Sequence, residues 1–198
     1  MAYSDFTLDD IKTKFQLLIR EDTDVFAHVD GVEVSETLQT ILQEYIPLAL
    51  AINTEKSRSE MMIAPILVEF RRMVRRQVSL FSGLEFNVDV QQGLNGVCDF
   101  IVSHSTEQLY ITTPIIMIVE AKNENMKAGL PQCIAAMVAA WLFNERQEHS
   151  IETLYGVVTT GNIWKFLQWA EGTVYVDLAE YHISNLGKLL GILLSMVT

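Results

Sequence analysis

The 198 residues suffice for one domain with a buried core, and a composition that is 49% hydrophobic and 20% charged excludes an intrinsically disordered protein. The two cysteines, Cys98 and Cys133, form neither a CxxC pair nor a disulfide framework, so we expect reduced thiols and a cytoplasmic location. The N-terminus lacks the apolar region of a signal peptide, and no apolar run is long enough to span a bilayer, so no membrane partner is predicted.

The charge is distributed unevenly along the chain. The net charge of −11 argues against a general nucleic-acid binder, since such proteins are normally basic. Residues 1–55 contain eleven acids and three bases, whereas residues 56–76 contain six bases and two acids. The second segment is therefore a local basic patch on an acidic molecule, which predicts weak, local binding to a polyanion.

Three helices are predicted ahead of any strand. Apolar residues recur at helical spacing over residues 6–20, 35–53 and about 59–77. Residues 1–55 are therefore predicted to be an acidic helical extension that packs on a core of residues 56–198. We expect the extension and the core to form one compact unit.

The third predicted helix carries both acids and arginines. At about 100° per residue, with Glu60 at 0°, its apolar face lies between about 280° and 340°, and Glu60 borders that face. Arg71 and Arg75 fall at about 20° and 60°, on the same edge as Glu60. They are either a solvated helix face or contacts to nucleic-acid phosphates. Glu69 falls at about 180°, where we expect a solvated partner of a neighbouring arginine.

The hydrophobic period changes to two after this helix. Residues 86–90 alternate between apolar and polar side chains, as in a half-buried strand. The run IIMIVEA at 115–121 is apolar almost throughout, as in a central strand buried on both faces. The order of elements predicts an α/β sandwich with a mixed central sheet flanked by helices. The other predicted elements are strands at 97–103, 155–159, 163–169 and 174–178, a helix at about 128–147, and a closing helix at 183–196.

Acidic and basic side chains stand at the ends of two predicted neighbouring strands. Asp99 interrupts one apolar strand, and Glu120-Ala121-Lys122 ends the next. Alternation along a strand places Glu120 and Lys122 on one face, and pairing of the two strands brings Asp99 beside them. A carboxylate within an apolar strand needs a compensating partner, and charges at the end of a central strand lie where α/β sheets bind ligands.

This set of side chains suits a magnesium site. Mg²⁺ prefers oxygen ligands, usually one or two carboxylates with water and phosphate, and Asp99, Glu120 and the backbone carbonyl of Ala121 can supply the protein's share. Mn²⁺ is an alternative ion. Lys122 can position or deprotonate the attacking water, or stabilise the charge of the transition state. The bare E-x-K tripeptide is common, so a surface salt bridge beside an unrelated aspartate is the simpler alternative.

The order of these residues resembles the PD-(D/E)XK nuclease superfamily: a helix with an acid, a strand Asp, a strand E-x-K, and a helix with a Gln. The likeness is greatest to the N-terminal nuclease domain of type I restriction-enzyme motor subunits. The segment NTEKSRSE at 53–60, followed by IAPIL at 63–67, also resembles small cyanobacterial proteins of this type. The likeness covers about residues 53–170 and implies a restriction-endonuclease-like fold.

The resemblance also implies roles for single residues. Asp99, Glu120 and Lys122 match the metal and catalytic positions. Glu60 matches the acid of the helix, a further metal contact, and Gln132 matches the catalytic glutamine of the following helix. Glu60 can equally be an acid favoured by the helix dipole, and Gln132 an exposed residue of the first turn. A cysteine occupies the position of the family's proline, which often varies.

Two functions of different classes follow from the sequence. The first is a Mg²⁺-dependent endonuclease of a restriction, repair or defence type, with DNA as its substrate. The second is a non-catalytic binding or interaction module that keeps the nuclease fold. The acidic N-terminal segment favours it, because that segment could cover a partner's basic surface or form a homodimer interface. The chain has no zinc-ligand spacing, no GxSxG and no Walker A sequence, so other hydrolase classes have no support.

Overall fold

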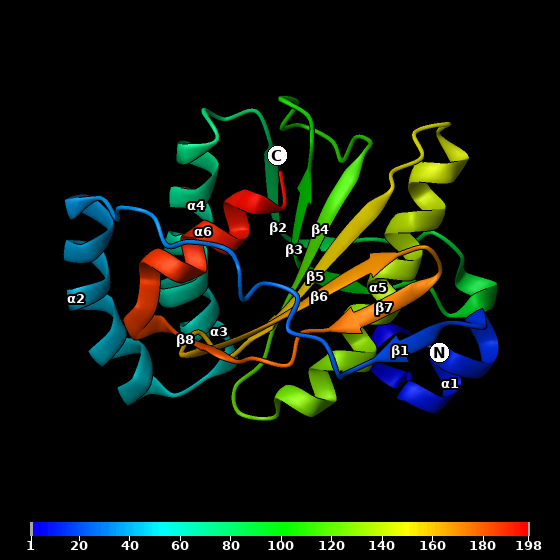
Figure 1. The fold of residues 1–198 in the computed structure, drawn as a ribbon, viewed down its shortest axis with the longest axis horizontal. Coiled ribbons are helices and arrows are strands. Elements are labelled where there is room, and N and C mark those ends of the chain that lie inside the picture. Colours follow the sequence, from blue (N-terminus) through cyan, green and yellow to red (C-terminus); the bar gives the residue numbers. More distant parts are fainter. Residues whose placement is uncertain (1, 198) are drawn as a thin grey trace.

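A mixed eight-stranded sheet forms the centre of the computed structural model, which describes residues 2–197 (Figure 1). Its strand order is β1-β7-β6-β5-β4-β3-β2, with β8 paired to β6. This arrangement confirms the predicted α/β class with a mixed sheet. The strands are β1 (Leu18–Arg20), β2 (Ser79–Glu85), β3 (Val97–Ser103), β4 (Ile115–Ala121), β5 (Thr153–Thr159), β6 (Ile163–Ala170), β7 (Thr173–Val176) and β8 (Tyr181–His182).

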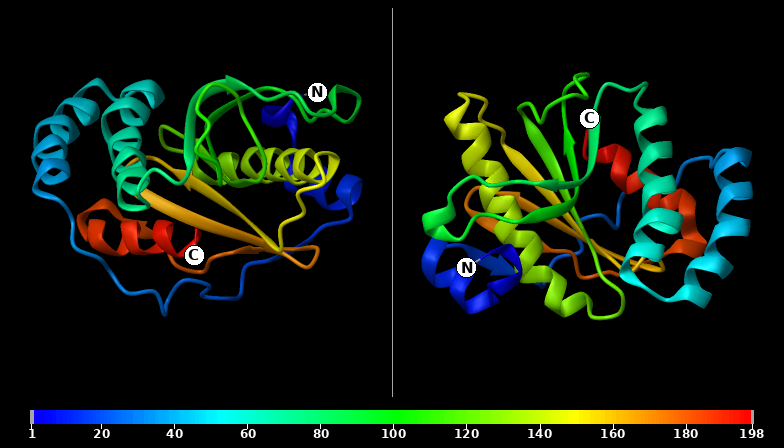
Figure 2. Two further views of the ribbon diagram at one scale, coloured as in Figure 1. Left: turned by 90° about the horizontal axis from the view of Figure 1, so that it is seen from above. Right: turned by 180° about the vertical axis from the view of Figure 1, so that it is seen from behind.

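Helices cover both faces of the sheet (Figure 2). On one face lie α1 and α5, and on the other lie α2, α4 and α6. The α-helices are α1 (Leu8–Phe15), α2 (Glu36–Ile52), α3 (Glu55–Arg58), α4 (Ala64–Met73), α5 (Met126–Arg146) and α6 (Leu186–Ser195). The shorter turns are η1 (Tyr3–Asp5), the π-helical η2 (Ser59–Ile63), η3 (Val90–Gln92) and η4 (Ile183–Asn185).

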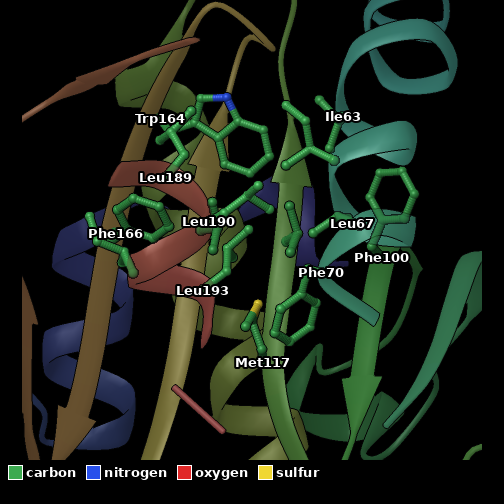
Figure 3. Packing of buried hydrophobic residues seen from close by; sticks show 14 of the residues in the cluster. Ile63, Leu67, Phe70, Phe100, Met117, Trp164, Phe166, Leu189, Leu190 and Leu193 are labelled. Atoms are coloured by element: carbon green, nitrogen blue, oxygen red, sulfur yellow. The ribbon is translucent and has the colours of Figure 1, made fainter. Parts of the chain in front are cut away.

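Two hydrophobic clusters hold these layers together, one on each face of the sheet. In the first, Trp164 and Phe166 of β6 face α6, and Leu67 of α4 packs on the other side of the same cluster (Figure 3). In the second, α5 lies on the sheet through small side chains. β4 contributes to both clusters, which confirms that it is a central strand buried on both faces.

The connection through α5 places the end of β4 beside β5. β2, β3 and β4 form an antiparallel meander, and α5 then crosses over so that β5 runs parallel to β4. A parallel pair needs such a crossover, because a hairpin joins only antiparallel strands. Among the described residues, α5 is the one helix long and apolar enough to cross a membrane, but half of its apolar stretch is buried in the protein.

The predicted N-terminal helix at 6–20 is wrong beyond Phe15. Gln16 adopts a left-handed conformation with φ of 54°, which ends α1. Leu18–Arg20 then form β1, which pairs in parallel with β7. The segment before residue 56 is therefore not purely helical, since it supplies an edge strand of the sheet. Helical spacing alone does not reveal a three-residue strand that is specified by its partner.

Two further boundaries differ from the predicted ones. The helix predicted at 59–77 begins at Glu55, includes the π-turn, and ends at Met73. The strand predicted at 86–90 is instead β2, at Ser79–Glu85, which pairs with β3. The alternation of β2 is interrupted at Gly83, whose φ of +64° suits glycine, so its sequence lacked the regular period of a strand.

Glu69 is buried, which corrects the expectation of a solvated side chain. Its side chain is 7% exposed, and Arg72 donates two hydrogen bonds of 2.7 Å to its two carboxylate oxygens. The expected ion pair with an arginine is therefore present. The helical wheel assigned α4 one buried face, but α4 packs between the sheet and α2, so a second face is covered as well.

Glu69→Gln should lower the free energy of unfolding by about 1–3 kcal/mol, because a charge-assisted hydrogen bond at a buried site is weakened. Glu60→Gln is the matched control on the same helix, since the Glu60 side chain is 58% exposed, and it should change stability little. Urea denaturation of both variants measures the difference. A larger loss in Glu60→Gln would contradict the burial of Glu69.

Candidate active site

Asp99 and Glu120 meet at the ends of two antiparallel strands. The register of β3 and β4 pairs Phe100 with Val119, so the next residues, Asp99 and Glu120, come opposite each other. The Asp99 side chain also links β3 to β4, because its Oδ2 accepts a 2.8 Å hydrogen bond from the backbone N–H of Ala121. The structure thus brings together the two carboxylates that the sequence placed on neighbouring strands.

Lys122 completes this group of side chains. Its Nζ lies 2.6 Å from Oε1 of Glu120, whose side chain is 2% exposed, and 3.9 Å from Oε2 of Glu55. The backbone N–H of Lys122 donates to the carbonyl of Thr159 at 2.8 Å, which continues the pairing of β4 with β5. The lysine is therefore held at both its backbone and its side chain.

The electrostatics of the site raise the pKa values of both Glu120 and Lys122. Burial, followed by the neighbouring Asp99 carboxylate, raises the pKa of Glu120 to about 8. Burial lowers the pKa of Lys122, but the carboxylates of Glu120, Glu55 and Asp99 outweigh it, so that pKa stays above its ordinary value. At neutral pH the lysine is an ammonium group, not a free base.

An open hollow of about 200 Å³ leads to Asp99. Glu60 lies on its wall, next to Lys56, whose Nζ is 3.0 Å from Oε1 of Glu60. The structure therefore places Glu60 and Asp99 around the same hollow. The remaining lining residues come from α3, the π-turn and β2, and they are Glu55, Ser59, Ser82 and Gly83.

Gln132 lies in the second turn of α5. It is half-buried and follows Gly129 by three residues, so the two share one side of the helix. No hydrogen bond between residues 2–197 joins the Gln132 side chain to Asp99, Glu120 or Lys122. The structure thus places Gln132 on the helix that contains Gly129 but not in the hydrogen-bonded group.

Arg71 and Arg75 lie far from the hollow, which corrects their expected position beside Glu60. At 1.5 Å per residue, Arg71 is about 16 Å further along the helix than Glu60. The Nε of Arg71 donates to the carbonyl of Val78, and Arg75 follows the end of α4 with φ of 53°. In Figure 1, α3 lies near the loop after β4, whereas α4 ends at the opposite end of the sheet. The angles around the helix placed the arginines on the same edge as Glu60, but angles do not contain the distance along the helix axis.

Sequence reasoning missed Gly129, which sets how closely α5 approaches the lysine. A Cβ at this position would lie 2.6 Å from Cγ1 of Val158 and 3.0 Å from Cγ of Lys122. Such contacts do not occur without displacement, so glycine keeps room for the lysine side chain. A glycine inside a predicted helix is the signal that could have found it, because it costs helix stability unless packing requires it.

The site offers few oxygen ligands for a magnesium ion. Among residues 2–197 there is no group of three or more His, Cys, Asp and Glu side chains placed to hold one metal ion. Two carboxylates side by side, one of them buried, with the backbone carbonyl of Ala121 as a further oxygen, still match the one or two carboxylates typical of Mg²⁺.

No family model matches this chain, and neither curated proteins nor solved structures show a significant match to it.

The raised pKa of Glu120 makes the folded protein depend on pH. Its pKa of about 8 in the folded state exceeds the ordinary value of 4.5, so folding favours the protonated acid. This contribution to stability is complete below pH 4.5 and is lost as the pH rises to about 8. Wild type should lose a few kcal/mol over this range, at about 1.4 kcal/mol per pKa unit. Glu120→Gln should lack that loss.

Urea denaturation at several pH values measures this dependence. The unfolding free energies of wild type and Glu120→Gln should diverge as the pH rises, in favour of the variant. Glu60→Gln is the exposed control, and its curve should run parallel to that of wild type. Parallel curves for Glu120→Gln would mean that the buried acid titrates near its ordinary pKa.

Proposed function

We propose that the protein is a metal-dependent phosphodiesterase that acts on DNA, as an endonuclease of the PD-(D/E)XK type. One observation carries the proposal: the Lys122 ammonium lies 2.6 Å from a buried Glu120, which stands opposite Asp99 at the end of a central strand. A stable fold has no need of two adjacent carboxylates in its interior, whereas a phosphodiesterase site does.

The order of elements also supports this proposal. The acid-bearing segment α3–η2 precedes the aspartate strand β3, β4 ends in E-x-K, and α5 follows with Gln132. This is the order on which the likeness to the superfamily rests. The restriction-endonuclease-like fold, the DNA substrate and a cytoplasmic location all belong to the proposal.

In this mechanism, Asp99, Glu120 and the carbonyl of Ala121 would hold Mg²⁺ or Mn²⁺, and Glu60 is a further acid at the hollow. A bound divalent ion would supply an activated water and offset charge on the phosphate. Lys122, charged at neutral pH, would position the attacking water or stabilise the negative charge that develops on the phosphate. Its raised pKa favours these roles over that of a general base.

The surroundings of the hollow favour a second candidate, a binding or interaction module that keeps the fold without cleavage. Three of the seven lining residues are acids, and one is a lysine already paired with an acid. Arg71 and Arg75, the proposed phosphate contacts, lie at the other end of the sheet. Repulsion of a polyanion is therefore expected unless cations or a partner, such as a second copy of the chain, offset it.

Lys122→Ala should lower the rate of DNA cleavage by about 100-fold or more, because a charge that stabilises the transition state is removed. Lys56→Ala is the matched control: Lys56 borders the same hollow, but its side chain is 82% exposed and it does not contact Glu120. Nicking of supercoiled plasmid with Mg²⁺ or Mn²⁺ measures both rates.

A folded Lys122→Ala variant that cleaves like wild type would rule out the catalytic assignment. No cleavage of any DNA or RNA by wild type would favour the binding module.

A further inference from the structure

Arg58 is a buried cation without an acidic partner. The residue is 9% exposed, and no carboxylate among residues 2–197 lies within ion-pair distance of its guanidinium. Its Nη1 donates to the carbonyl of Thr160 at 2.9 Å, and its Nη2 and Nε donate to Oδ1 of Asn53 at 2.9 and 3.3 Å. Burying an unpaired charge is costly, so stability alone does not explain this arginine.

The two acceptors join Arg58 to both sides of the candidate active site. Asn53 ends α2 in a left-handed conformation, and its carbonyl accepts a 3.2 Å hydrogen bond from Nδ2 of Asn123, the neighbour of Lys122. Thr160 directly follows the residue whose carbonyl accepts the backbone N–H of Lys122. The Arg58 guanidinium therefore connects α3 directly to Asn53 at the end of α2 and to the turn after β5. Through Asn53 it is also linked to the loop after β4.

The segment that Arg58 fixes carries two of the three acids that line the hollow. Glu55 lies three residues before it on α3, and the π-turn with Glu60 begins directly after it. A π-turn holds one more residue per turn than an α-helix, is rare, and is found mostly at functional sites. Glu60 lies within this turn, so its position depends on where the turn is held.

We propose that Arg58 is a positioning residue that clamps α3 and the π-turn to the end of the sheet, so that Glu55 and Glu60 stay close to Asp99 and Lys122. This inference rests on the proposed function for its effect on cleavage. The coupling of α3 to the loop after β4 and to the turn after β5 is a structural claim that does not depend on the proposed function.

Two substitutions break the hydrogen bonds between Arg58 and Asn53, one on the donor side and one on the acceptor side. Arg58→Met keeps the apolar stem and removes the donors, and Asn53→Gly removes the acceptor while tolerating the φ of 52°. Each should lower kcat by about 10- to 100-fold, the usual effect of losing a group that supports a site. KM should change by less than about threefold, because no proposed substrate contact is removed. The double variant should be no worse than either single one.

Two controls separate positioning from general destabilisation. Asn53→Asp keeps the acceptor and the left-handed backbone, so it should retain kcat close to that of wild type. Arg72→Met removes an arginine at the far end of the same helix, with its Glu69 ion pair, and should leave kcat unchanged. A lower melting temperature with unchanged kcat in Arg58→Met, or equal loss of kcat in Arg72→Met, would overturn the proposal.

Amide hydrogen exchange gives a readout that does not depend on activity. In Arg58→Met, exchange should accelerate at Lys122 and Gly161, whose N–H groups donate to Thr159, but not at Ile101 in β3. If wild type cleaves no nucleic acid, the phosphodiesterase proposal fails, and exchange alone then decides the role of Arg58. Unchanged exchange at both amides would overturn the clamp.

Discussion

The burial of Glu120 beside Asp99 is the constraint on which the candidate site depends. Two carboxylates at the end of a sheet, one of them 2% exposed, repel each other and lose hydration. The structure meets this cost with Lys122, whose ammonium lies 2.6 Å away, and with a raised pKa that keeps Glu120 neutral. Removing Lys122 would raise the pKa of Glu120 further, whereas a bound cation would lower it.

The fold holds this balance in place through elements distant in sequence. β4 is buried on both faces, so its side chains up to Glu120 have little freedom, and β5 fixes the backbone of Lys122. α5 approaches the lysine because Gly129 has no side chain. α3 brings further acids to the edge of the site and is tied to the sheet by Arg58.

The elements of the fold could be predicted from the sequence where apolar residues recur at a regular spacing or form a long run. β3, β4 and α5 were located well, because their apolar runs are long and their faces are buried as the periods indicate. β1 was predicted as part of a helix, because it is only three residues long. β2 was predicted several residues too late, because Gly83 interrupts its alternation. The burial of Glu69 and the distance of the arginines from the hollow depend on packing and on length along an axis, which a helical wheel does not contain.

The central claim is that Asp99 and Glu120 share one divalent cation, and crystals soaked in Mn²⁺ test it most directly. The account predicts one anomalous peak between the two carboxylates, with the carbonyl of Ala121 among its ligands and Lys122 displaced from Glu120. Crystals of Glu120→Gln soaked in the same way should lack this peak or show it much weakened. A wild-type site without the peak, with Lys122 still hydrogen-bonded to Glu120, would contradict the account.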